Sequence, residues 1–387
     1  MKKKASVVII GGGVNGLAIA YNLAKLGMKD IIVLEKNYLG SGASGRNAGG
    51  VRAQFVLKEN IGLAIKSQEI YKELSKELGF NVLFKQGGYL FLAHNDSEDN
   101  YLKKNVLVQN SLNVHSRIVY GDEIRKLVPS INTNKILSGS FCKTDGVVVH
   151  QAVVWGFAEQ AKRLGVDIYQ STEVTSIQKF GRRVCGVHTN KGNIETNLVV
   201  NAAGARSRDI AKMIGIDLPN RPYRREMLVT ESVKHFLNPM VISLNSGLYV
   251  NQTLRGEIVM GASNPSEPSS YRIDSSMDFL KLVTKAFNDL FPNLKDIHIL
   301  RQWGGLYDIS PDFSPILGRV EDLEGFILAC GWSGHGLMLS PIIGRLISEL
   351  IVDNKTSISI EPYNLRRFKE GKLLQEVSLH EHSNEQI

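Results

Sequence analysis

The first fifty residues combine glycines, a carboxylate and apolar runs in an arrangement that could hold a phosphate-bearing ligand. The apolar residues 6–10 lead directly into a G-x-G-x-x-G turn formed by Gly11, Gly13 and Gly16. In such a turn the first glycine permits the tight bend, the second lets the backbone approach a pyrophosphate, and the third allows close helix–strand packing. Glu35 ends a second apolar run, where a carboxylate would accept hydrogen bonds from ribose hydroxyls. The pattern predicts a dinucleotide-binding unit.

The segment after Glu35 indicates which dinucleotide to expect. Residues 40–50 read GSGASGRNAGG and are unusually rich in small residues. Such a segment lets backbone N–H groups approach a large flat cofactor such as FAD. A helix that begins after Gly13 would turn its positively polarised N-terminus toward the pyrophosphate.

The loop at residues 40–50 resembles that of the D-amino-acid oxidase superfamily of FAD-dependent enzymes, which includes sarcosine oxidase, glycine oxidase and dye-linked proline dehydrogenase. The resemblance extends over nearly the whole chain, because further blocks follow in the order of that superfamily. It is strongest to the beta subunits of hetero-oligomeric sarcosine oxidase and of archaeal L-proline dehydrogenase. The additional blocks are residues 86–93, 199–207, 304–318 and 331–338.

The resemblance implies a non-covalent FAD. The cysteine that carries FAD in monomeric sarcosine oxidase is matched here by Gly305, and the lysine in the terminal turn of that enzyme is matched by Met338. In the superfamily this terminal turn stabilises negative charge on the reduced flavin. The residues that the motifs and the resemblance together assign to FAD are Gly11, Gly13, Val14, Asn15, Gly16, Glu35, Lys36, Ser44, Arg46, Asn47, Gly49, Gly50, Val174, Ala203, Gly204, Gly305, Gly334, His335, Gly336, Leu337 and Met338.

Four residues are candidates for the substrate side of the flavin. Arg52 could pair with a substrate carboxylate, although a flavin phosphate or a structural ion pair would also suit it. Tyr249 could bind the same carboxylate or be a half-buried sheet residue, and His335 could bond the flavin edge or only pack in its turn. Tyr307 stands where glycine oxidase and D-amino-acid oxidase carry an arginine for the carboxylate. The resemblance therefore leaves the carboxylate partner open.

His150 raises the question of a second flavin. It matches the histidine that carries FMN covalently in the sarcosine-oxidase form, and the alternative is that it caps a helix over residues 151–164. The lysine implicated in oxygen activation in the oxidases would fall near Val259, and it is absent. This departure favours a dehydrogenase whose electrons leave through an alpha subunit, an FMN at a subunit interface or another acceptor.

These features predict the oxidation of a small secondary amino acid, such as sarcosine or L-proline, to an imine. One alternative is a primary-amine, glycine or D-amino-acid deaminating enzyme, and another is a non-catalytic flavin-binding subunit. An FAD-dependent RNA-modifying enzyme is a third, because 46 Lys and Arg against 38 Asp and Glu give a net charge of +8. The basic residues are scattered, however, and we expect no nucleic-acid partner.

Composition excludes other classes of protein. Of 387 residues, 43% are hydrophobic and 22% charged, which is typical of a globular chain. No apolar stretch reaches the roughly 18–20 residues of a bilayer span, so we expect a cytoplasmic protein with no membrane span. The three cysteines are far apart and are expected to be reduced core thiols, and no metal site is assigned.

These residues must be positioned by a Rossmann-like α/β FAD-binding domain. This domain is expected to be interleaved with an antiparallel-sheet substrate domain, so that the chain is α+β overall. The FAD-binding domain is expected to comprise residues 1–85, 145–215 and 300–370, and the substrate domain 86–144 and 216–299. Strands are expected at 88–93, 227–230, 247–251 and 258–261, helices at 61–78, 277–291 and 340–352, and a flexible tail at 375–387.

Overall fold

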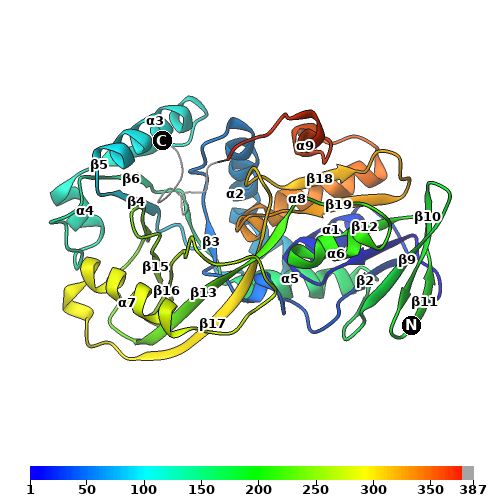
Figure 1. The fold of residues 1–387 in the computed structure, drawn as a ribbon, viewed down its shortest axis with the longest axis horizontal. Coiled ribbons are helices and arrows are strands. Elements are labelled where there is room, and N and C mark those ends of the chain that lie inside the picture. Colours follow the sequence, from blue (N-terminus) through cyan, green and yellow to red (C-terminus); the bar gives the residue numbers. More distant parts are fainter. Residues whose placement is uncertain (377–387) are drawn as a thin grey trace.

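The computed structural model describes residues 1–376 and has two parts that lie side by side (Figure 1). One part contains a six-stranded sheet and the other an eight-stranded sheet. Strands of both sheets come from early, middle and late segments of the chain, so the polypeptide passes repeatedly between the two parts. The expected mixed α/β architecture is confirmed, while the domain boundaries stay a prediction.

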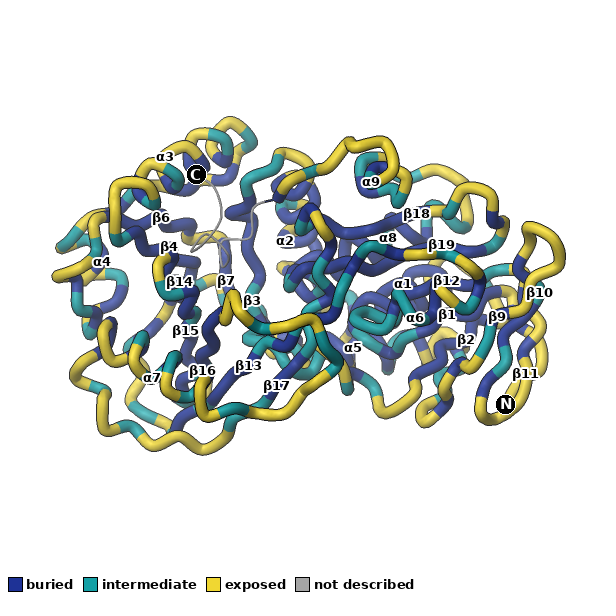
Figure 2. The backbone as a smooth tube through the Cα atoms, viewed as in Figure 1, coloured by how far each residue is buried: buried dark blue, intermediate teal, exposed yellow. Residues whose placement is uncertain are grey.

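The six-stranded sheet is parallel except at its edge strand β18, which runs antiparallel to β19. All residues of β1 and β2 are buried, as expected for short apolar strands that are covered on both faces (Figure 2). Because these strands are parallel neighbours, their carboxyl ends meet at one edge of the sheet. In order across the sheet the strands are β18 (Ile316–Arg319), β19 (Phe326–Cys330), β12 (Val199–Asn201), β1 (Val7–Ile10), β2 (Ile31–Leu34) and β8 (Asp167–Tyr169).

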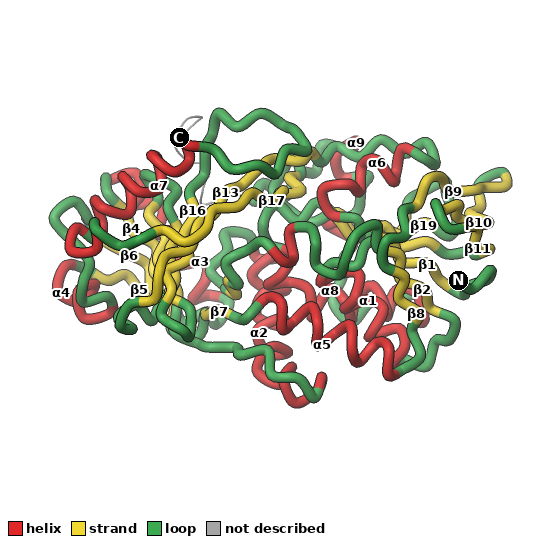
Figure 3. Tube along the Cα trace, turned by 90° about the horizontal axis from the view of Figure 1, so that it is seen from below, coloured by secondary structure: helices red, strands yellow, loops and turns green. Residues whose placement is uncertain are grey.

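Alternate residues of β1 pack into two different hydrophobic cores, one on each face of the six-stranded sheet. Val7 and Ile9 pack with the main helices, whereas Val8 and Ile10 pack with a three-stranded sheet on the other face (Figure 3). None of the helices within residues 1–376 has the length and apolar character needed to cross a bilayer. The helices on the first face are α1 (Val14–Lys25), α2 (Lys58–Leu78), α5 (His150–Arg163) and α8 (Gly336–Val352). The second face carries the strands β9 (Val174–Phe180), β10 (Arg183–Thr189) and β11 (Gly192–Glu195). Two short helices, α6 (Ser207–Lys212) and α9 (Arg367–Glu370), lie at the periphery.

The eight-stranded sheet is antiparallel except for one parallel pair, β14 with β4. The predicted antiparallel sheet is confirmed. The parallel pair arises because a long crossover between β4 and β14 returns the chain in the same direction. In order the strands are β17 (Ile299–Ile309), β13 (Arg221–Ser232), β16 (Glu257–Gly261), β15 (Tyr249–Gln252), β14 (Met240–Ser243), β4 (Tyr89–Ala93), β6 (Ser138–Cys142) and β5 (Ser116–Val119).

Helices cover the eight-stranded sheet away from the six-stranded one (Figure 1). Helix α7 (Met277–Leu290) can pack on this sheet because it has one apolar face. The buried residues of that face recur at helical spacing and are Phe279, Val283, Phe287 and Leu290. Ser276 caps the helix by accepting a hydrogen bond from the Phe279 N–H. Helix α4 (Gly121–Leu127) packs on the same face as α7, whereas α3 (Asp96–Ser111) packs on the opposite face through Leu102. The short pair β3 (Gly50–Val51) and β7 (Gly146–Val147) also lies on the side of α3, because Tyr89 of that face lies against Gly50.

Two residues near the ends of elements lie differently from what the sequence suggested. Helix α5 begins at His150 with Val149 in the capping position, so His150 does not cap it. Glu376, expected in a flexible tail, is buried because its carboxylate accepts hydrogen bonds from the Val56 and Leu57 N–H groups at 2.9 and 3.0 Å. Residues 377–387 of that predicted tail lie outside the described residues.

Helices α1 and α8 pack so closely that a glycine is required between them. A Cβ added at Gly344 of α8 would lie 2.8 Å from the Ala18 Cβ and 2.9 Å from its backbone. A rigid helix backbone cannot move away as a flexible side chain can. The backbones of the two helices are therefore in direct contact.

We expect Gly344→Ala to lower the free energy of unfolding by about 1–3 kcal/mol, because the new methyl group overlaps the α1 backbone. A matched control is Gly62→Ala in α2, where an added Cβ meets nothing within 4 Å. That variant should gain about 0.5–1 kcal/mol from better helix propensity. Denaturant unfolding of both proteins measures the difference, and equal stability would contradict the close packing.

Candidate functional site

The G-x-G-x-x-G residues form a turn whose geometry requires glycine. Gly11 has φ of +117°, and a Cβ added at Gly16 would lie 2.1 Å from the Gly11 carbonyl oxygen. Helix α1 follows directly, and Ser44 Oγ accepts the Val14 N–H at 2.9 Å. The first turn of a helix offers further N–H groups without intrahelical partners. This end of α1 is therefore suited to a pyrophosphate.

Glu35 is fixed beside this turn. Its Oε2 accepts the Gly12 N–H at 2.9 Å, and its Oε1 accepts the Asn37 N–H at 2.8 Å and the Ser41 hydroxyl at 3.3 Å. A carboxylate has about four acceptor positions, so room remains for a ribose hydroxyl. Lys36 is exposed at the next position. The geometry fits the predicted role of Glu35 in holding the adenosine half of FAD.

Internal hydrogen bonds hold the loop at residues 40–50 in place. Arg46 donates to the Ser41 carbonyl at 3.0 Å and to the Gly304 carbonyl at 2.9 Å. Asn47 accepts the Gly49 N–H at 2.8 Å. These two predicted FAD residues thus bond protein groups and support the loop.

The glycine turn before α8 is built on a buried carboxyl group. Asp308 Oδ2 accepts the Gly331 N–H, and the Asp308 carbonyl accepts the Ser333 N–H at 2.8 Å. Burial raises the pKa of Asp308 to about 7. A Cβ added at Gly334 would lie 2.5 Å from the Tyr307 ring, so Tyr307 lies directly against this turn.

The N-termini of α1 and α8 are tied together by Asn15. Its side-chain amide donates to the Gly336 carbonyl at 3.1 Å. Its buried Oδ1 has no hydrogen-bond partner among residues 1–376. Helix α8 begins at Gly336, four residues earlier than the sequence pattern suggested, so Leu337 and Met338 belong to its first turn. An orphaned acceptor between two positively polarised helix ends fits a cofactor that carries both hydroxyl and anionic groups.

The remaining predicted FAD residues surround the same turn or lie near it. A Cβ added at Gly11 would lie 2.4 Å from the Ala202 carbonyl, which places Ala203 and Gly204 beside the G-x-G-x-x-G turn. Val174 is buried at the start of β9, and the nearby Thr172 N–H donates to the Glu35 carbonyl at 2.8 Å. Three separate chain segments therefore meet here.

Arg52 and His335 form a buried pair. Arg52 Nη2 lies 3.2 Å from His335 Nε2, Arg52 Nη1 donates to the Gln54 carbonyl, and only 4% of Arg52 is exposed. The guanidinium also stacks on the Phe55 ring at 4.2 Å. Because a guanidinium only donates, Nε2 must hold a lone pair. This contact therefore requires a neutral His335 with its proton on Nδ1.

A polar network that the sequence did not predict supports this pair. The buried Asp145 carboxylate accepts hydrogen bonds from the Ala53 N–H at 2.8 Å and from Gln54 and Gln68 at 3.0 and 2.7 Å. Burial raises the pKa of Asp145, while these donors and the charge of Arg52 oppose the shift. These residues are scattered in the sequence and carry no motif.

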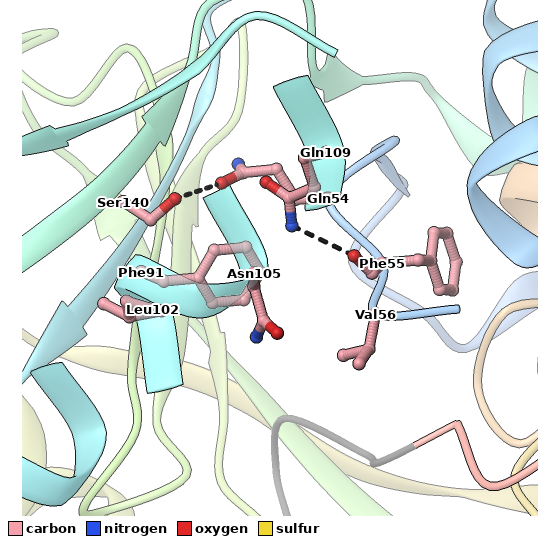
Figure 4. Close-up of a pocket in the computed structure, with 8 residues that line it drawn as sticks. All are labelled: Gln54, Phe55, Val56, Phe91, Leu102, Asn105, Gln109 and Ser140. Atoms are coloured by element: carbon pink, nitrogen blue, oxygen red, sulfur yellow. Dashed lines mark hydrogen bonds between the residues drawn. The ribbon is translucent and has the colours of Figure 1, made fainter. Parts of the chain in front are cut away.

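A small cavity of about 10 Å³ lies next to this network (Figure 4). It is about the size that one water molecule needs, and an amino acid does not fit. The buried Oε1 of Gln109 has no hydrogen-bond partner in the described chain, which is consistent with a water molecule at this place. The lining residues are Gln54, Phe55, Val56, Phe91, Leu102, Asn105, Gln109 and Ser140.

Comparison with known proteins identifies the family. The model of the DAO family, FAD dependent oxidoreductase, matches residues 6–350. The chain belongs to this family of FAD-dependent oxidoreductases. The predicted superfamily, fold class and enzyme class are thereby confirmed, and FAD is the cofactor of the family.

Several relatives match over nearly their full length. Sarcosine oxidase subunit beta of Rhodobacter capsulatus is 32% identical over 380 residues, which cover 97% of this chain and 91% of that protein. The crystal structure of L-proline dehydrogenase from P. horikoshii has a TM-score of 0.92 and 37% identity, with 96% of this chain and 100% of that one covered. Glycine oxidase from Geobacillus kaustophilus has a TM-score of 0.88, 24% identity, and coverage of 95% and 99%, which supports the fold alone.

We expect Glu35→Ala to weaken FAD binding about 10- to 100-fold, because an acceptor for the ribose is lost and the Gly12 N–H loses its partner. Flavin absorbance per chain after dialysis measures retention. Glu173→Ala removes an exposed carboxylate and serves as the control, which should keep its flavin. Equal flavin content in the two variants would contradict the role of Glu35.

Proposed function

We propose that this protein oxidises a small secondary amino acid, of the sarcosine or L-proline class, to the corresponding imine. A carbon–hydrogen bond next to nitrogen breaks, its hydrogen leaves with two electrons as a hydride, the N–H proton passes to solvent, and a C=N bond forms. Bound FAD supplies the hydride acceptor. The names of the relatives, sarcosine oxidase subunit beta and L-proline dehydrogenase, support this substrate class.

The observation that carries this proposal is a wall of tyrosines against the loop at residues 40–50 and the glycine turn. A Cβ added at Gly50 would lie 1.7 Å from the Tyr89 hydroxyl, and Tyr307 lies against Gly334. Tyr249 packs against the hydrophobic cluster that contains Tyr89. Aromatic rings form suitable walls for the small apolar body of a secondary amino acid.

His335 is better suited to positioning than to proton abstraction. Its Nε2 accepts the Arg52 hydrogen bond, so this nitrogen is not available to abstract a proton. His335 directly precedes the first turn of α8, where it would help to orient this helix end against the flavin edge. In this assignment Arg52 acts through His335 and is a positioning residue.

The substrate class can be tested by anaerobic reduction of the purified holoprotein. We expect sarcosine or L-proline to bleach the flavin at least about tenfold faster than glycine or D-alanine, because the wall accommodates an N-alkyl group. Absorbance in a stopped-flow instrument measures the rate. Reduction only by glycine or D-alanine, with release of ammonia, would establish the deaminating alternative. Absence of bleaching by all four compounds would support a non-catalytic subunit.

We also propose that the electrons leave through a partner subunit. β16, where the oxidase lysine was expected, contains no lysine. Some relatives are named as beta subunits, which supports a hetero-oligomer. A suitable surface lies beside a cavity of about 540 Å³, where Leu83 and Leu254 are exposed and Lys72 and Lys85 add positive charge.

His150 lies close to this surface and is the proposed attachment point for FMN. Its neighbour Val149 donates a backbone hydrogen bond to the Val82 carbonyl at 3.1 Å, in the segment that lines the cavity. Burial lowers the pKa of His150 to about 4, and the Gly45 backbone opposes the shift. A neutral imidazole is the nucleophilic form. Its Nε2 has no partner among the described residues, but it is buried and must become accessible before it can react.

His150→Ala should abolish any flavin that stays with the protein after acid precipitation, because the nucleophile is removed. Fluorescence of the washed precipitate measures it, with any co-purifying subunit included. His115→Ala removes an exposed histidine and is the control. Absence of acid-stable flavin from the parent protein would contradict covalent attachment, and its persistence in His150→Ala would exclude this residue.

A further inference from the structure

The pairing of β13 with its neighbours places an arginine on the tyrosine wall. Arg225 is opposite Gly305 in β17, so the two share a face of the sheet, and Tyr307 lies on that face two residues further on. Met227 is opposite Gly261 in β16, and Gly261 is opposite Tyr249 in β15. Because Arg225 and Met227 are two residues apart, Arg225, Tyr307 and Tyr249 all project from one face.

This face points toward the proposed FAD site. A Cβ added at Gly305 would lie 3.1 Å from the Arg46 Cβ in the loop at residues 40–50. Asn251, two residues after Tyr249, donates to the Ala48 carbonyl in the same loop at 2.7 Å. The face therefore lies against the segment that would run along the flavin.

The Arg225 guanidinium lies over the Tyr307 ring, and its Nη1 donates to the Arg224 carbonyl at 3.2 Å. Its central carbon lies 5.6 Å from the Tyr307 ring centroid. Burial raises the pKa of Tyr249 well above its ordinary value, and the charges of Arg225 act in the opposite direction. A cation, a phenol hydroxyl and an aromatic ring are thus gathered in one partly buried place.

Arg52, the arginine that the sequence suggested for the carboxylate, is placed differently. Only 4% of it is exposed, and it bonds His335 and the Gln54 carbonyl. Its charge also acts on two buried acids, Asp145 and Glu376. The hydrogen bonds that the structure shows for Arg52 are thus made to groups of the protein.

We propose that Arg225 binds the carboxylate of the substrate, with the Tyr249 hydroxyl as a second donor and Tyr307 as a wall. This inference rests on the proposed oxidation of a secondary amino acid. It explains how the chain manages without an arginine at position 307, because a residue on the adjacent strand supplies the charge to the same face. Paired guanidinium–carboxylate hydrogen bonds would then fix the orientation of the substrate.

The test uses tetrahydro-2-furoate, a proline-shaped carboxylate that has no oxidisable amine, with the FAD-loaded protein. Its binding is followed by the change in the flavin absorbance spectrum. We expect Arg225→Met to weaken binding about 100-fold and Arg225→Lys to recover part of it, because a charge-assisted pair is lost or reduced. Arg301→Met, which removes an exposed arginine of β17, is the matched control and should bind as the parent does.

Further readouts separate binding from folding. FAD content and circular dichroism of Arg225→Met should equal those of the parent. Unchanged tetrahydro-2-furoate affinity in Arg225→Met, with a large loss in Arg52→Met, would overturn the inference while leaving the proposed function intact. A parent protein that neither binds this carboxylate nor is reduced by any secondary amino acid would overturn both.

Discussion

The direct backbone contact between α1 and α8 is the constraint on which the site depends. Gly344 against Ala18 and Gly16 against Gly11 allow approaches that no side chain would permit. As a result, two helix N-termini converge at Asn15, although their sequences are more than 300 residues apart. The partial positive charges at the two helix N-termini therefore act on the same point. The strands before each helix, β1 and β19, are held on either side of β12, so the sheet fixes the direction of both helices.

A network of buried polar groups connects the start of α8 to α2 and to the segment that contains Arg52. Asp145 links Gln54 of the Arg52 segment to Gln68 of α2, and Arg52 in turn contacts His335 at the start of α8. Glu376, more than 300 residues later in the sequence, accepts hydrogen bonds from backbone N–H groups at the N-terminus of α2. Isolated buried charges are costly, whereas charges with several hydrogen-bond partners specify a single arrangement. This network explains why segments distant in sequence hold a fixed geometry.

The sequence was most informative where local chemistry decides the structure. The glycine turn, Glu35, the apolar strands and α7 all follow from short-range patterns, and they lie where those patterns predict. The sequence was less informative where partners come from afar. His150 begins its helix without capping it, Glu376 is buried by a distant helix end, and nothing in the motifs identifies Asp145. The face that Arg225 occupies could not be predicted for the same reason, since only the register of β13 shows it.

That register is itself constrained by the opposite face of β13. Arg224, the neighbour of Arg225, points away from the tyrosine wall and is only 8% exposed. It pairs with both oxygens of Glu267 at 2.9 and 3.0 Å and also contacts Asp274 at 3.3 Å. A slip of one residue would move Arg225 away from Tyr307 and force Arg224 from its buried acids onto the wall. Two adjacent arginines thus lie on opposite faces of β13, and the burial of Arg224 among its acids fixes the face on which Arg225 lies.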